Sequence, residues 1–199
     1  MTGMRNRGLS KDEVARTALA VLDDFGLPDF TMRRLAAALD VQQSSLYWHF
    51  PNKQTLLAEL SDRIVGRDTA AIDGEWPDRV RREALSLRDA LLAFRDGAEV
   101  VASSLALGLG ENRAETRLRE ALDDSPFDPT TVRRASATLL HFILGHVSLE
   151  QQRLQYDSLG ARDGDSETRQ QNLGVDDFEF GVKTIISGLQ TAAKTVSSS

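Results

Sequence analysis

Apolar residues recur every three or four positions along most of this chain, and no convincing stretch alternates apolar and polar residues as a β-strand does. Because an α-helix turns once every 3.6 residues, this spacing gathers the apolar side chains on one face of each helix. The chain is therefore predicted to be all-α. The expected helices cover residues 10–25, 32–39, 42–48, 52–67 and 78–94, a short helix within 95–110, and residues 111–122, 130–155 and 176–196.

Capping residues mark several of the expected helix ends. Ser10 and Glu13 form an S-x-x-E capping box, in which each side chain satisfies a backbone N–H near the helix start. Gly26 followed by Pro28 is expected to stop the first helix. Asp128 is expected to cap the long helix that follows it.

The helical pattern loosens at residues 68–78, DTAAIDGEWPD, which indicates a domain boundary or hinge. We therefore expect one domain at residues 1–67, in which a three-helix bundle is followed by a fourth, linking helix. A second helical domain is expected at residues 68–199. Within it, the polar, glycine-containing stretch 156–174 is predicted to be a loop.

The last two helices are long, and they are more apolar than a single buried face requires. This excess favours pairing of the two helices with their copies in a second subunit, so that a homodimer is expected. The alternative is that they are the buried central helices of a monomer. The pattern alone leaves both arrangements open.

The composition narrows the class of protein. The chain has no cysteine, which excludes a disulfide scaffold and thiolate metal sites, and it has no long apolar run that could span a membrane. The N-terminus lacks the apolar stretch of a signal peptide, so a cytoplasmic location is expected. The net charge is −6, yet residues 1–67 carry nine basic and eight acidic residues. A nearly neutral first domain can still bind an anion if its basic residues share one face.

Aromatic residues crowd into the stretch SSLYWHFPNK, where Tyr47, Trp48 and Phe50 lie almost side by side in a chain that is only 6% aromatic. A capped first helix, two short helices and a fourth helix are the arrangement of a helix-turn-helix DNA reader, which presents one polar short helix to the major groove. Glutamine can bond adenine, and arginine can bond guanine or phosphate. Without further information, a small helical bundle with polar faces remains the alternative.

The pattern T-x-R-x-L-A-x-x-L-x-V-x-x-x-x-L-Y-x-H-F-x-N-K resembles the DNA-binding signature of the TetR family of bacterial repressors. The resemblance implies that Leu46 and Phe50 hold the recognition helix to the bundle. It also implies that Asp40 stands where glycine is common in the turn, at a modest cost because aspartate tolerates the left-handed conformation. The residues implied to contact DNA are Arg33, Gln43, Ser44, Ser45, Tyr47, Trp48, His49 and Lys53.

The segments WPD, RDGAEVV, HFILGHV and FEFGVKTIISGL resemble, in order, the C-terminal domain of the tetracycline-repressor branch of that family. This implies a ligand-binding domain, a dimer formed by the last two long helices, and release from DNA when a small molecule binds. That branch has a metal-coordinating histidine where this chain has Val101, so Mg-tetracycline is not the expected inducer, and a more apolar organic molecule is. The implied ligand-binding residues are Glu83, Leu87, Val101, Ser104, Leu105 and His141, although His141 can equally be a satisfied polar residue between helices.

Two other classes of function compete with a ligand-controlled repressor. The first is an enzyme that uses His141, His146 and Glu150, but five helical positions separate the two histidines by about 140° around the helix axis. No metalloprotease, phosphate-loop or nucleophile-elbow motif is present, so we expect neither an enzyme nor a metal or other cofactor. The second alternative is a helix-turn-helix protein without small-molecule control, acting through a protein partner or as an architectural factor. The sequence does not distinguish activation from repression.

Overall fold

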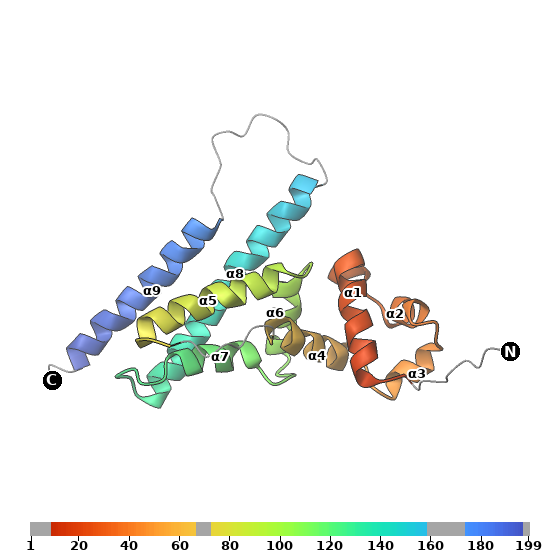
Figure 1. The fold of residues 1–199 in the computed structure, drawn as a ribbon, viewed down its shortest axis with the longest axis horizontal. Helices are drawn as coiled ribbons and strands as arrows, with labels where there is room; N and C mark the ends of the chain where they lie inside the picture. The colour runs from red at the N-terminus through yellow and green to blue at the C-terminus, as the bar shows by residue number, and fades with distance from the viewer. Residues whose placement is uncertain (1–8, 67–72, 159–173, 197–199) are drawn as a thin grey trace.

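The computed structural model describes residues 9–66, 73–158 and 174–196, and within these ranges every regular element is an α-helix (Figure 1). The expectation of an all-α chain is confirmed. The helices are α1 (Lys11–Asp29), α2 (Met32–Ala38), α3 (Gln43–Tyr47), α4 (Lys53–Val65), α5 (Trp76–Leu92), α6 (Gly97–Ala106), α7 (Arg113–Ala121), α8 (Pro129–Ser158) and α9 (Val175–Val196).

Caps confirm two of the predicted helix starts, with the Ser10 half of the predicted capping box present. The Ser10 side chain accepts a hydrogen bond from the Glu13 N–H at 3.1 Å, and the Asp128 carboxylate accepts from the Thr130 N–H at 2.9 Å. Gly26 has φ 75° and breaks α1, but the chain resumes a helical turn as far as Asp29, so the predicted end is a kink.

The structure corrects the start of the predicted loop 156–174. The helix α8 continues through Ser158, because no glycine or proline occurs between Gly145 and Gly160. Residues 159–173 lie outside the described part of the chain. The predicted domain boundary at residues 67 and 68 also falls outside it.

Helices α1–α3, here called the head, form a small bundle at one end of the molecule, and α4 leads from it to the body, α5–α9 (Figure 1). Helix α1 packs against α2 and α4, and α2 packs against α3. These helices enclose a common apolar core. The fully buried side chains that fill it include Val14, Ala18, Leu22, Phe30, Leu35, Leu46, Phe50, Leu56 and Leu60.

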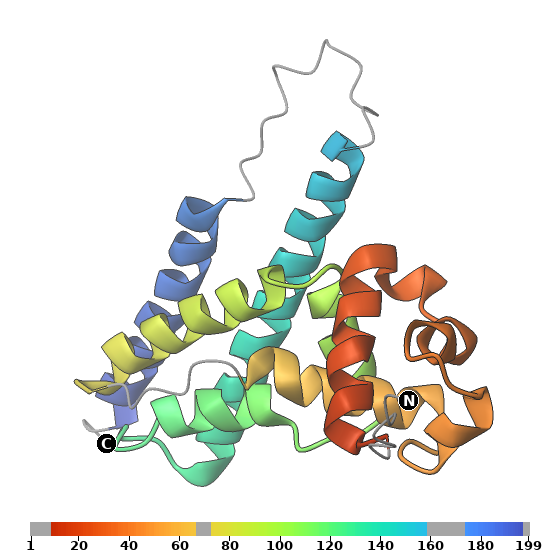
Figure 2. The same cartoon turned by 45° about the vertical axis from the view of Figure 1, so that its right-hand side comes forward.

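The body packs around α5, which contacts α7, α8 and α9, while α6 lies against both α4 and α8 (Figure 2). The two long helices α8 and α9 run side by side. Phe142 of α8 stacks on Phe178 of α9 with ring centroids 5.6 Å apart, and Gly181 lets the Phe142 ring approach the α9 backbone. Among the described helices, none is long and apolar enough to cross a membrane.

Candidate DNA-binding site

The turn between α2 and α3 has the geometry that a helix-turn-helix requires. Thr31 caps α2 by accepting a hydrogen bond from the Arg34 N–H at 3.1 Å. Asp40 has φ 52°, the left-handed conformation predicted for this position, which glycine adopts at less cost. The Val41 N–H then donates to the Ala36 carbonyl at 3.0 Å, which closes the turn and sets the direction of α3.

The short helix α3 has one inward-facing anchor and an exposed outer face. Leu46 is fully buried and Phe50, just past the helix, is 1% exposed, so their predicted role in holding α3 is confirmed. Trp48 is 89% exposed and Tyr47 is 44% exposed. Large aromatic side chains are usually buried, and an exposed pair on one helix face is typical of a binding surface. The aromatic cluster therefore divides into a core part and a surface part.

The polar side chains predicted to read DNA are accessible to solvent in whole or in part. Arg33 and Ser44 are exposed, while Ser45 and His49 are partly buried. The Gln43 amide donates a hydrogen bond to the Tyr47 hydroxyl at 2.8 Å, one helical turn away. The structure thus adds a contact between two of the predicted residues that sequence reasoning missed.

Lys53, the first residue of α4, is bound to the head. Its ammonium group donates to the Phe30 carbonyl at 2.7 Å and lies 5.5 Å from the centroid of the Phe30 ring. In this DNA-free structure, Lys53 therefore ties the start of α4 to the connection between α1 and α2. The Asn52 side chain caps α4 beside it, accepting from the Thr55 N–H at 2.8 Å. Free backbone N–H groups at a helix start favour an anion such as phosphate.

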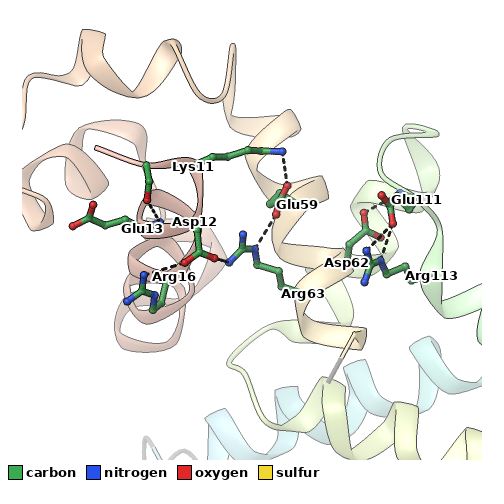
Figure 3. A network of polar contacts seen from close by, with 10 residues as sticks. Lys11, Asp12, Glu13, Arg16, Glu59, Asp62, Arg63, Glu111 and Arg113 are labelled. Atoms are coloured by element: carbon green, nitrogen blue, oxygen red, sulfur yellow. Dashed lines mark hydrogen bonds and ion pairs between the residues drawn. The ribbon is translucent and has the colours of Figure 1, made fainter. Parts of the chain in front are cut away.

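An ionic network joins α1 to α4 (Figure 3). Arg63 of α4 donates to Asp12 at 2.7 Å and to Glu59 at 2.9 Å, and Lys11 pairs with Glu59 at 2.8 Å. The hydrogen bonds from Arg63 and then Arg16 lower the pKa of Asp12. Burial acts to raise the pKa of Glu59, but the bonds from Lys11 and Arg63 outweigh it and lower that pKa. The i, i+4 pairs were readable from the sequence, whereas the pairs between helices were not.

Two further joints connect the head and α4 to the body. Asp62 of α4 accepts from the Glu111 N–H at 2.8 Å, beside the ion pair of Glu111 with Arg113 (Figure 3). At the kink of α1, the Leu27 N–H donates to Asp96 at 2.8 Å. An open groove of about 720 Å³ lies beside the first of these contacts, lined by residues of α1 and α4, by Phe94 and Glu111 in the connections on either side of α6, and by Arg113 at the start of α7. The head and α4 are therefore attached to the body by specific hydrogen bonds at two places.

The structure separates the residues predicted to bind a ligand. Leu87, Val101 and Ser104 are buried in the body, and Leu105 is partly buried. The Ser104 hydroxyl is already satisfied by the Val100 carbonyl at 3.1 Å. His141 is exposed on α8 and so stands apart from this buried group in the single chain.

Glu83, the remaining predicted ligand residue, is buried and paired with Arg117 of α7, a partner that sequence reasoning missed. The sequence did contain a signal for this buried pair. Arg117 occupies an inward position of α7 between the buried Ala114 and Leu118, and Glu83 occupies one of α5 beside the buried Val80. Charged residues at core-facing positions are rare unless they are paired. In the parts of the chain that the structure describes, no cluster of three or more His, Asp or Glu suits a metal ion.

Comparison with known proteins now decides the family. Residues 15–60 match the family described as "Bacterial regulatory proteins, tetR family", and residues 70–193 match the domain described as "Tetracyclin repressor-like, C-terminal domain". The chain belongs to the TetR family. Members of the TetR family are DNA-binding regulators rather than enzymes.

Relatives of known identity support the same TetR-family assignment over nearly the whole chain. The class C tetracycline repressor protein of Escherichia coli is 36% identical over 192 residues, which cover 94% of this chain and 81% of that protein. The crystal structure of Mycobacterium smegmatis BioQ has a TM-score of 0.78 and 38% identity, covering 92% of this chain and 98% of BioQ. A structure of BioQ with its double-stranded DNA operator has a TM-score of 0.75 and 36% identity, with the same coverage.

The expectations about fold and class are therefore confirmed at the level of the family. The protein is a DNA-binding transcriptional repressor of the TetR family, with an N-terminal helix-turn-helix head and a helical C-terminal domain of the tetracycline-repressor type. The exposed face of α3, with Gln43, Tyr47 and Trp48, is the natural candidate for contact with the major groove.

Proposed function

We propose that the protein is a homodimeric repressor that binds a palindromic operator and leaves it when a small organic inducer, other than Mg-tetracycline, binds the domain of residues 68–199. The observation that carries the DNA-binding part is the outer face of α3, where an 89% exposed tryptophan stands beside polar groups while Leu46 is fully buried. An exposed large aromatic side chain beside polar groups is typical of a surface that binds another molecule.

Within this proposal the residues of the head have distinct roles. Gln43 and Ser45 read base edges, with Ser44 nearby, because amide and hydroxyl groups match the donors and acceptors of the major groove. Tyr47, Trp48 and His49 lie against phosphates and groove walls. Two basic residues complete the set, with Arg33 binding a base or phosphate and Lys53 binding a phosphate beside the start of α4.

Exposed apolar side chains on the last two helices support the homodimer. Leu149 and Leu154 of α8 are 52% and 58% exposed, and Phe180 of α9 is 73% exposed. Burial of such side chains against a second copy removes apolar area from water, which favours association. A two-fold dimer presents two copies of α3, so the operator is expected to be palindromic.

The mostly apolar character of the predicted ligand-binding residues between 83 and 105 supports an apolar organic inducer. Leu87 and Val101 are apolar and buried, and Ser104 contributes a single hydroxyl. Pockets for organic ligands are mostly apolar, with a few polar groups that fix the orientation of the ligand. His141 joins this group if the second subunit or the inducer covers it.

The test starts from the source genome. Fragments captured on purified protein are sequenced, and enrichment of one or a few palindromes beside promoters is the expected result. Compounds suggested by the adjoining genes are then added to the protein–operator complex, and one of them is expected to lower operator affinity by about 5–150-fold. Retention of DNA without a shared motif would contradict the proposal and favour the alternative, a DNA-binding protein without small-molecule control.

The dimer is tested separately with Phe180→Glu. A carboxylate in place of the exposed phenylalanine leaves the fold of one chain intact but cannot be buried in an interface without a large cost. We expect light scattering to show a loss of dimer of at least tenfold. Phe25→Glu is the matched control, because Phe25 is 41% exposed and belongs to α1 of the head rather than to α8 or α9. Equal dimer fractions in both variants would contradict the proposed interface.

A further inference from the structure

The pair of Arg117 and Glu83 is the most enclosed of the ion pairs between described residues, with 8% and 7% of the two side chains exposed. Removing two charges from water costs several kcal/mol per ion, and an ion pair repays this only when its geometry is favourable. Burial raises the pKa of Glu83, while the Arg117 guanidinium opposes that rise. A buried ion pair is therefore weak evidence for added stability, and the other contacts of Arg117 indicate a structural role.

The contacts of the Arg117 guanidinium connect three helices. One nitrogen pairs with the Glu83 carboxylate of α5, and another donates to the Ser86 hydroxyl, also of α5, at 2.8 Å. A third contact is a hydrogen bond to the carbonyl of Val65. Arginine suits this role because its planar fork holds several acceptors at fixed angles, which a flexible ammonium group cannot do.

Val65 is the last residue of α4, so the hydrogen bond from Arg117 reaches a carbonyl at the C-terminal end of that helix. The final carbonyls of a helix lack N–H partners within the helix, and they carry the negative end of its dipole. A guanidinium at that place satisfies the carbonyl and complements the dipole. Arg117 thus fixes the C-terminal end of α4 to the interface between α5 and α7.

The position of α4 determines the position of the head. Its first turn is joined to the head by Lys53, and its last turn by the ion pair of Arg63 with Asp12. A helix of 13 residues is about 20 Å long, so a tilt of about 5° moves its far end by about 2 Å. Displacements of this size are enough to weaken hydrogen bonds between α3 and base edges.

We propose that Arg117 is a positioning residue for DNA recognition. By holding the Val65 carbonyl against Glu83 and Ser86, it fixes the C-terminal end of α4 and thereby the placement of the head on the body. The surface joints at Asp62 and Asp96 are exposed or partly exposed, whereas this one is buried. The operator arm of the test below rests on the proposed function, and the exchange arm does not.

The test compares Arg117→Met with Arg88→Met. Arg88 pairs with Glu150 of α8 at 2.5 Å and its side chain is 10% exposed, so both substitutions break a buried ion pair that involves α5. The pairs differ in that Arg117 also bonds the end of α4. A comparable loss of thermal stability is expected in both variants, which makes Arg88→Met a control for loss of stability alone.

The first readout is hydrogen exchange in the DNA-free protein, followed in a peptide that covers α4. We expect the amides in the last turn of α4 to exchange at least tenfold faster in Arg117→Met than in Arg88→Met. The second readout is affinity for the operator and for versions with one base pair added or removed between the half-sites. Arg117→Met is expected to lose at least tenfold on the native spacing and less on the altered ones, whereas Arg88→Met keeps the preference for native spacing.

Equal exchange of α4 in the two variants would overturn the proposal, and so would an unchanged spacing preference in Arg117→Met. Arg117→Lys serves if the methionine variant does not fold. Its single ammonium group keeps the charge but cannot satisfy Val65, Glu83 and Ser86 together, so an intermediate exchange rate is expected, and a wild-type rate would contradict the role of the fork. If the wild-type protein recognises no operator, the proposed function fails while the exchange measurement still decides the role of Arg117.

Discussion

Replacing Trp48 with alanine separates DNA binding from folding more cleanly than any other change in the head. The side chain is 89% exposed, so the folded protein loses almost no buried area, and the free energy of unfolding is expected to change by less than about 0.5 kcal/mol. If DNA covers half of a tryptophan surface of about 200 Å², at about 25 cal/mol per Å², the loss in binding is about 2.5 kcal/mol per subunit, or roughly 70-fold.

The chain offers an internal probe for this measurement. It contains two tryptophans, and Trp76 lies in the body, packed edge-on against Phe127 with ring centroids 5.5 Å apart. In the wild-type protein, addition of an operator duplex is expected to change the tryptophan fluorescence through Trp48. In Trp48→Ala this change disappears, while Trp76 still reports thermal unfolding. Operator affinity is measured in parallel by the anisotropy of a labelled duplex.

Phe50→Ala provides the contrast for Trp48→Ala. Phe50 is 1% exposed, and removal of a buried phenylalanine costs about 3–5 kcal/mol of stability. Although the two residues are only two positions apart, Trp48→Ala is thus expected to lose operator affinity with little loss of stability. Phe50→Ala is expected to lose stability. Unchanged operator affinity in Trp48→Ala would refute the assignment of the exposed face, and so would an affinity loss explained entirely by a lower unfolding temperature.

Three further changes test other parts of the structure. Gln43→Ala is expected to cost about 1–3 kcal/mol in binding and to relax the preference at one base position, measured on operators with single-base changes. Gly181→Ala places a Cβ 2.2 Å from the Phe142 ring and should lower stability by about 1–3 kcal/mol in thermal unfolding, whereas Gly188→Ala in the same helix meets open space. Burial lowers the pKa of His146 in the folded protein below its unfolded value of 6.5, so below about pH 6.5 the unfolded chain binds more protons than the folded chain. The free energy of unfolding is therefore expected to be unaffected by this histidine above about pH 6.5 and to fall as the pH drops below it. Urea unfolding between about pH 5 and 8 measures the change.

Each of these expectations has an opposing outcome. Equal losses for Gln43→Ala on operator and random DNA would contradict its reading role. Equal unfolding temperatures for the two glycine variants would mean that the Phe142 ring moves aside without cost. For the histidine, His146→Gln is the control, and an identical pH dependence in the wild type and this variant would rule out His146 as the source.

The sequence predicted the head well because its structure depends on local signals. The Ser10 cap and the buried Leu46 follow from residue type and helical spacing. The left-handed Asp40 and the inward position of Phe50 were instead implied by the resemblance to the TetR signature.

Contacts between distant segments could not be predicted in the same way. The bond from Arg117 to Val65 joins residues 52 positions apart, and the bond from the Leu27 N–H to Asp96 joins residues 69 positions apart. Helical periodicity states which face of a helix is buried, but it does not state which helix covers that face. The inward positions of Glu83 and Arg117 were visible, whereas their partnership required the packing of α5 against α7.

The hydrogen bond between Gln43 and Tyr47 has a consequence for the entropy of recognition. A glutamine that rotates freely loses about 0.5–1.5 kcal/mol when a partner immobilises it, and here the Tyr47 hydroxyl already restricts that rotation before DNA is present. The amide has two N–H groups and one oxygen, so one N–H can stay with Tyr47 while the other N–H and the oxygen pair with adenine. In the proposed base-reading role of Gln43, Tyr47 therefore restricts the rotation of the glutamine side chain. Part of the entropy cost of fixing this side chain on a base is then already met when the protein folds.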